Sequence, residues 1–146
     1  MTVSLAQAST IVDTALKKAR ELKQMPQTVV VLDPGGHIVC AKREDNSGII
    51  RYELAVGKAY GALGMGWGSR TMMERAAQNP NFLTSVVAAS DGRLVPNPGG
   101  VLIRDANNQV LGAVGISGDT GDNDEIIAVA GIEAAGLKAD PGGTKK

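Results

Sequence analysis

The second half of the chain carries the pattern of a β-hairpin. Residues 98–105 read PGGVLIRD and residues 110–119 read VLGAVGISGD, two apolar runs on either side of a polar turn at 105–108. The turn reads DANN, and Asn favours such turns because it tolerates a positive φ. Hairpin strands pair antiparallel, so we expect an antiparallel sheet.

A second hairpin is predicted near the N-terminus. Residues 28–32 form a largely β-branched run, residues 33–36 read DPGG, and residues 37–42 return as a strand. Apolar residues at helical spacing predict helices around both hairpins. The predicted helices are 4–24, 50–65, 71–78 (capped by Ser69) and 124–137, and residues 81–89 are compatible with one helical turn followed by a strand or loop.

The order helix, hairpin, helices, hairpin, helix predicts the fold class. We expect an α/β (α+β) domain in which helices cover one or both faces of an antiparallel sheet. A chain of 146 residues is the size of one domain. We place the domain at 1–139 and a flexible tail at 140–146.

Composition narrows the functional classes. The formal net charge is zero, with 15 basic and 15 acidic side chains, and only four aromatic residues occur, so a nucleic-acid-binding protein is not expected. Cys40 is the single cysteine, which excludes an internal disulfide and a cysteine-cluster metal site. No apolar run is long enough to span a bilayer, and the N-terminus lacks the pattern of a signal peptide. We therefore expect a cytoplasmic protein with no membrane partner.

Three basic residues are the candidate anion binders: Arg43, Arg51 and Lys58. Arginine offers a planar fork to a carboxylate, whereas lysine offers a point charge. Lys58 lies on an otherwise apolar helix face, so solubility alone does not explain it. The implied ligand is a small anionic molecule.

The loops around the second hairpin add further candidates. Glycines at 99, 100 and 118 let the backbone approach a ligand closely, and Ser117 precedes a helix start, a common place for a small ligand. Helix capping is the favoured interpretation of Asp122 and Asp124. Glu125 is a candidate catalytic base.

His37 is the only histidine, and two interpretations of it stay open. Beside a Gly-Gly turn its ring can simply hydrogen-bond the backbone, which is the favoured reading. Alternatively, the imidazole is a haem-iron ligand or a general base.

These motifs together resemble the GlcG/HbpS family, which includes haem-binding proteins, a glycolate-operon protein and the C-terminal domain of PduO-type corrinoid adenosyltransferases. The resemblance runs from about Leu5 to Leu137 and includes VVVLDPGGHIV at 29–39, AVGKAY at 55–60 and DEIIAVAG at 124–131. It implies a sheet of about five strands, a homo-oligomer and haem as a possible cofactor. It also matches Lys58 and Glu125 to family positions. If haem binds, Tyr52, Met65, Met72, Met73 and Cys40 are further candidate ligands.

Three functions follow as hypotheses. The first is a small-ligand-binding protein for haem or a related tetrapyrrole, with Arg43, Arg51, Tyr52 and Lys58 among the contacts. The second is a cofactor-independent catabolic enzyme (a lyase, isomerase or hydratase) acting on a small carboxylate or an aromatic-degradation intermediate. There Lys58 and an arginine hold the carboxylate, and Glu125, Asp45 or His37 moves the proton. The third is an accessory subunit of an oligomer.

Overall fold

Five antiparallel strands form one sheet within residues 1–144, the part of the chain that the computed structural model describes. The helices are α1 (Leu5–Glu21), α2 (Arg51–Met65), α3 (Ser69–Gln78), α4 (Pro80–Ala89) and α5 (Gly121–Ala134). The strands are β1 (Thr28–Leu32), β2 (Ile38–Arg43), β3 (Gly100–Arg104), β4 (Val110–Ser117) and β5 (Lys138–Asp140), in the spatial order β2-β1-β4-β3-β5. The expected α+β domain with a five-stranded antiparallel sheet is therefore confirmed.

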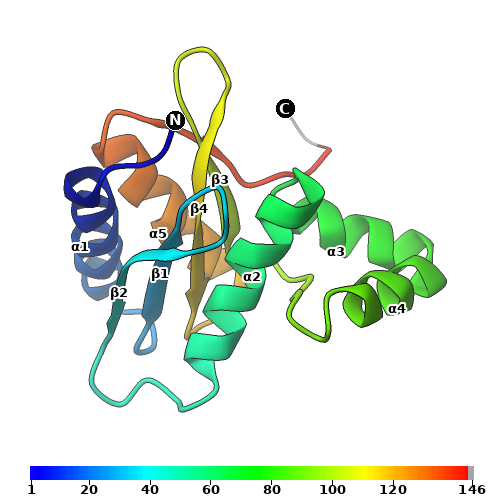
Figure 1. Ribbon diagram of the computed structural model, residues 1–146. Helices are drawn as coiled ribbons and strands as arrows, with labels where there is room; N and C mark the ends of the chain where they lie inside the picture. The colour runs from blue at the N-terminus through cyan, green and yellow to red at the C-terminus, as the bar shows by residue number, and fades with distance from the viewer. Residues whose placement is uncertain (145–146) are drawn as a thin grey trace.

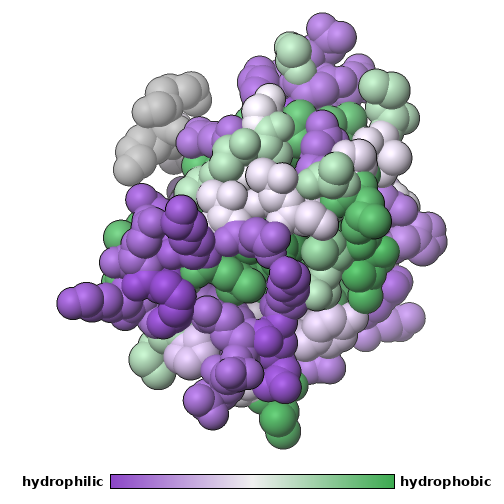
Figure 2. All heavy atoms as spheres, turned by 90° about the vertical axis from the view of Figure 1, so that its left-hand side faces the viewer, coloured by the Kyte–Doolittle hydropathy of each residue, from purple (hydrophilic) through white to green (hydrophobic). Residues whose placement is uncertain are grey.

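Helices cover both faces of the sheet. α1 and α5 pack on each other and on one face, and α2 crosses the other (Figure 1). Ser4 caps the start of α1. Its hydroxyl accepts from the backbone N–H of Gln7, and the Gln7 side chain accepts from the backbone N–H of Ser4, which together form a capping box. Its Ile11 and Val12 side chains are fully buried against the sheet. The outer side formed by α1 and β2 is mostly hydrophilic, with smaller hydrophobic patches (Figure 2).

The central strands are buried on both faces. All of β1 is buried, and β4 is buried from Leu111 to Ser117. Apolar residues therefore run along these strands without a polar alternation. Two hydrophobic clusters result, one between the sheet and the α1–α5 pair and one between the sheet and α2.

Small residues let α2 lie directly on the sheet. A Cβ added at Gly115 of β4 would lie 1.8 Å from the Ala55 carbonyl oxygen of α2. On the other side of α2, Cβ atoms at Gly57 and Gly61 would collide with Val95 and Leu94. Gly57 and Gly61 of this helix are thus explained by close contacts within the chain, whereas a Cβ at Gly64 would meet nothing within 4 Å.

Several elements differ from the sequence predictions. α4 is a full helix whose Asn79 side chain accepts from Phe82 N–H, and the interpretation of Ser69 as a cap is wrong, because Gly68 holds that position. The predicted tail is partly attached to the domain: Asp140 pairs with Leu102 in the sheet. Gly143 N–H donates to Thr71 Oγ1 at 2.8 Å. Residues 145–146 lie outside the described part of the chain.

α3 and α4 form an arm that extends sideways from the end of α2 (Figure 1). Within Pro80–Ala89 no residue is fully buried, although the helix contains Phe82, Val86 and Val87. Among residues 1–144, no helix combines enough length and apolar character to cross a membrane.

Candidate functional site

A buried ion pair joins α2 to the start of α5. Lys58 is 4 % exposed, and its Nζ donates to Asp124 Oδ2 at 3.0 Å and to the carbonyl oxygen of Ile116 at 2.8 Å. Asp124 is completely buried. Charged side chains are almost never buried without a partner, so this pair is a specific feature of the fold.

The Pro-Gly-Gly segment makes room for Lys58. Gly99 has φ +117°, and a Cβ there would lie 3.0 Å from Lys58 Nζ. A Cβ at Gly100 would lie 2.3 Å from the Lys58 carbonyl oxygen and 2.9 Å from Ser69 Oγ, which accepts from Gly100 N–H. The close approach that these two glycines permit is therefore to α2 and α3 of the same chain, and at Gly99 also to Ile116 and Asp124.

Asp124 is the centre of a polar network. Its Oδ1 accepts from Gln27 Nε2 at 2.9 Å and from the backbone N–H of Asp119 at 3.0 Å. The helix cap is Thr120, whose hydroxyl accepts from Asn123 N–H, so the interpretation of Asp124 as a capping residue is wrong. A carboxylate in a first helical turn suits the helix dipole, which is why sequence reasoning assigned it to the helix end.

Burial and a neighbouring cation lower the pKa of Lys58. Removal from water disfavours the ammonium form, and the charge of Arg51 acts in the same direction. Asp124 opposes both effects through its charge and its hydrogen bond, but the net shift is downward. An amine with a lowered pKa in a hollow is a candidate functional group.

Lys58 forms part of the wall of a polar cavity of about 440 Å³. Arg51, from the first turn of α2, donates from Nη1 to Ser117 Oγ at 3.2 Å. The cavity thus brings together Arg51, Lys58 and Ser117, three residues predicted from the sequence. Its walls are Arg51, Leu54, Lys58, Arg70, Met73, Val95, Asn97, Pro98, Ser117 and residues 119–122.

Arg70 belongs to the cavity and was missed by sequence reasoning. Its Nε donates to Glu125 Oε2 at 2.9 Å, and its Nη2 bonds Asp122. These two carboxylates raise the pKa of the guanidinium. Arg70 precedes the apolar positions of a short amphipathic helix, where a basic residue is ordinary, so the sequence carried no distinguishing signal. Glu125, the predicted base, is engaged in this ion pair.

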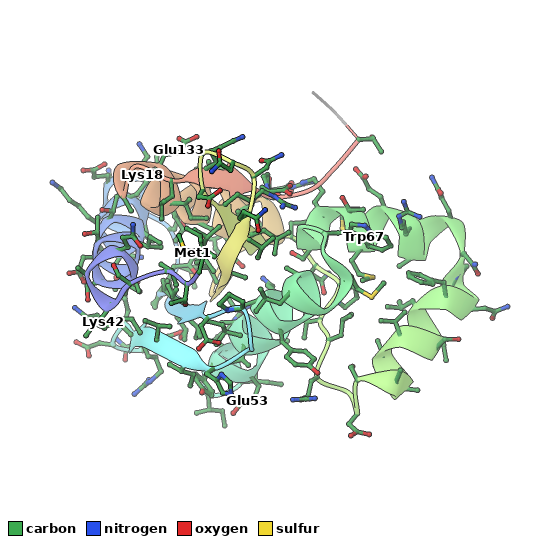
Figure 3. All side chains as sticks on the ribbon, turned by 45° about the horizontal axis from the view of Figure 1, so that its top comes forward. Met1, Lys18, Lys42, Glu53, Trp67 and Glu133 are labelled. Carbon is green, nitrogen blue, oxygen red and sulfur yellow. The ribbon has the colours of Figure 1, made fainter. Side chains whose placement is uncertain are left out.

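A second, more apolar hollow of about 370 Å³ adjoins the polar cavity. The two hollows share Leu54 and Val95 as walls. Tyr52 and Ile50 line the apolar side. Glu53, also on this wall, lies near the start of α2, whereas Trp67 lies at the junction with α3 (Figure 3).

Other predicted site residues lie elsewhere. His37 is on the exposed β1–β2 turn, with Nδ1 3.2 Å from Asp33 Oδ1. Arg43 lines a separate hollow with Glu44 and Asp45. A Cβ at Gly118 would collide with Pro26 and Gln27, so that glycine serves chain packing.

The candidate haem ligands are dispersed. Met73 lines the polar cavity and Tyr52 the apolar hollow, while Met72 is buried in α3 and Cys40 lies on the edge strand β2. Met65 is at the end of α2. Within the described residues, no three His, Cys, Asp or Glu side chains gather as a metal site requires.

Known proteins share this fold and sequence pattern. A protein of Citrobacter freundii, described as an uncharacterized 15.0 kDa protein in the dhaT-dhaS intergenic region, is 28% identical over 132 residues, covering 90% of this chain and 91% of that protein. The PduOC:heme complex matches with a TM-score of 0.84 at 23% identity over 100% of both chains, a likeness of fold. The Klebsiella pneumoniae protein ORFY also matches with a TM-score of 0.84, at 26% identity over 93% of this chain and 92% of that one.

A family model agrees with the resemblance seen in the sequence. The model described as haem degrading protein HbpS-like matches residues 3–133. That span includes both hairpins, Lys58, the Pro-Gly-Gly segment and Asp124. The chain therefore belongs to the HbpS-like family.

Proposed function

We propose that this protein binds haem or a related tetrapyrrole, with the carboxylates in the polar cavity and the ring in the apolar hollow. The observation that carries the proposal is that the two hollows share Leu54 and Val95. A tetrapyrrole has the same division, an apolar plane with anionic arms. The haem named in the description of the family model and in the PduOC complex supports this ligand class.

The polar cavity suits a carboxylate. Arg51 donates one N–H to Ser117 Oγ, and its other N–H groups are available to a ligand in the cavity. Lys58 adds a basic group that is paired with one carboxylate, Asp124, whereas Arg70 is held by two, Asp122 and Glu125. Arg51 is therefore the main anchor.

The apolar hollow offers the phenol oxygen of Tyr52 to an iron atom. Tyr52 lines this hollow and is 38% exposed, and phenolate oxygen is an established haem ligand. Met73, in the polar cavity, is the alternative sulfur donor. Bound haem would supply iron-centred redox chemistry, while Arg51 would orient it.

A hemin titration followed at the Soret band tests this proposal. We expect saturable binding by the wild-type protein and weakening of about tenfold in Arg51→Gln, the effect of losing one charged hydrogen bond. Arg43→Gln is the matched control, because Arg43 lies in a separate hollow. Equal weakening in both variants, or no saturable binding by the wild type, would overturn the proposal.

The ligand to the iron has its own test. Tyr52→Phe is expected to change the Soret maximum of the complex, and His37→Ala is expected to leave it unchanged because His37 lies outside both hollows. The reverse pattern would assign the iron to His37.

A second candidate function is catalysis on a small carboxylate. The observation that favours it is the buried Lys58 amine beside Arg51.

Homo-oligomer formation and cytoplasmic location stay predictions, to be checked by light scattering of the purified protein and by cell fractionation.

A further inference from the structure

The Lys58 amine has one hydrogen-bonding direction left for the cavity. An ammonium group has three N–H donors. Two of them meet the Ile116 carbonyl and the Asp124 carboxylate, at 2.8 Å and 3.0 Å. Lys58 is also one of the residues that line the cavity, so the third N–H is the donor left for a molecule bound there.

The same amine is set up for nucleophilic chemistry. Desolvation and a neighbouring cation are the two conditions that activate a lysine as a nucleophile, and burial and Arg51 supply both. Asp124 is the proton acceptor that an ammonium needs before it can attack, and it is held in place by Gln27 and by Asp119 N–H. An ion pair that only stabilised the fold would not need to border a cavity, as the Lys58–Asp124 pair does.

We propose that Lys58 forms an imine with the carbonyl carbon of a small 2-oxo acid whose carboxylate is bound by Arg51. The carboxylate and carbonyl of such an acid are on adjacent carbons, and one molecule can meet both side chains because Arg51 and Lys58, about two turns apart on α2, line the same cavity. The imine rests on the carboxylate-binding role proposed above for the polar cavity, and not on tetrapyrrole binding.

The step balances with the groups present. The Lys58 ammonium gives one proton to Asp124, and the free amine adds to the carbonyl carbon. Asp124 returns that proton to the oxygen, then moves a second proton from nitrogen to the same oxygen, which leaves as water. The product is a protonated imine, so one positive charge still faces the Asp124 carboxylate. This charge draws electrons from the neighbouring carbon, as a lyase or isomerase requires.

Reductive trapping tests the imine. The protein is incubated with pyruvate and cyanoborohydride, which converts an imine into a stable secondary amine, and the product is followed by intact mass and peptide mapping. We expect one carboxyethyl group per chain, on Lys58. Acetone, which lacks the carboxylate, is expected to label Lys58 about tenfold more slowly, the cost of one lost charged contact.

Lys42 is the internal control. It lies on the edge strand β2, on the far side of the sheet from Trp67 (Figure 3), and Asp13 raises its pKa. Pyruvate is expected to modify Lys58 at least about tenfold faster than Lys42, since a lower pKa leaves more free amine. Labelling spread over surface lysines, with no preference for Lys58, would overturn the proposal.

Two variants test the proposal, so that the test still works if one of them does not fold. Lys58→Arg keeps the positive charge and removes the nucleophile, so specific labelling should disappear. If that variant does not fold, Arg51→Gln retains Lys58 and should slow its labelling by pyruvate more than by acetone. Both carbonyls lose the pKa-lowering charge of Arg51, but only pyruvate also loses its carboxylate contact. Equal slowing with both carbonyls, or none, would contradict the carboxylate assignment. Hemin binding without labelling would contradict only the imine, and labelling without hemin binding only the tetrapyrrole.

Discussion

Two lysine–aspartate pairs in this protein have similar geometry and opposite surroundings. Lys42 Nζ lies 2.7 Å from Asp13 Oδ1 with side chains 55% and 60% exposed, whereas Lys58 Nζ lies 3.0 Å from Asp124 Oδ2 with side chains 5% and 0% exposed. The surface pair raises the pKa of Lys42, and burial lowers the pKa of Lys58 despite its partner. The burial of each pair, and not the distance between its charged atoms, therefore decides whether the pKa of the lysine rises or falls.

The largest expected effect comes from removing one partner of the buried pair. Lys58→Met leaves the Asp124 carboxylate buried without its cation, which should lower the free energy of unfolding by about 3–5 kcal/mol. Lys42→Met should leave it unchanged within error, because exposed pairs contribute little. Urea denaturation of both variants measures the difference.

The double variant Lys58→Met/Asp124→Asn is the control for this prediction, because the Asn amide oxygen can still accept from Gln27 Nε2 and Asp119 N–H. It removes both charges, so most of the lost stability should return. If the double variant were no more stable than Lys58→Met, the loss would come from packing around position 58 and not from an uncompensated carboxylate.

The glycine that accommodates Lys58 gives the next effect. In Gly100→Ala the added Cβ would lie 2.3 Å from the Lys58 carbonyl oxygen, and the backbone shift should cost about 1–3 kcal/mol. Gly64→Ala, in α2, is the contrasting substitution, since a Cβ there meets nothing within 4 Å. It should stabilise the protein by up to about 1 kcal/mol. Thermal and urea unfolding of the two variants would show shifts of opposite sign.

Sequence reasoning reached the fold because local patterns dictate it. The hairpin at 98–119 and the amphipathic first helix need only β-branched runs, Asn turns and apolar spacing. α4 was harder, because FLTSVVAA combines residues that suit both a strand and a helix. β5 is three residues long and depends on pairing with β3, which no local pattern indicates.

The site was predictable only in part. Lys58 was singled out because a charge on an apolar helix face is unusual. Asp124 was not, because a carboxylate in a first helical turn already has an explanation, and its true partner is 66 residues away in sequence. Arg70 and its contacts with α5 likewise arise from the folding of distant segments.

Arg70 provides an ion pair of intermediate burial. Its side chain is 26% exposed and that of Glu125 is 17% exposed, between the values of the two lysine pairs. Arg70→Gln should therefore lower the free energy of unfolding by about 1 kcal/mol, less than Lys58→Met. Urea denaturation would show whether the loss in Arg70→Gln lies between those of Lys42→Met and Lys58→Met. A loss as large as that of Lys58→Met would mean that partial exposure does not weaken the pair.

The smallest expected effect is a difference in the sign of two pH dependences. In the unfolded chain both lysines release their proton near pH 10.5. Folded Lys58 releases it at lower pH, so between its folded pKa and 10.5 the unfolded chain binds more protons and stability rises with pH. Folded Lys42 keeps its proton above pH 10.5, so its contribution is present below that pH and is lost as pH rises through its folded pKa. Unfolding free energies are measured from pH 8 upwards for the wild type, Lys42→Met and Lys58→Met/Asp124→Asn. The wild-type minus variant differences should have opposite slopes. Parallel slopes would show that burial of Lys58 does not control its protonation.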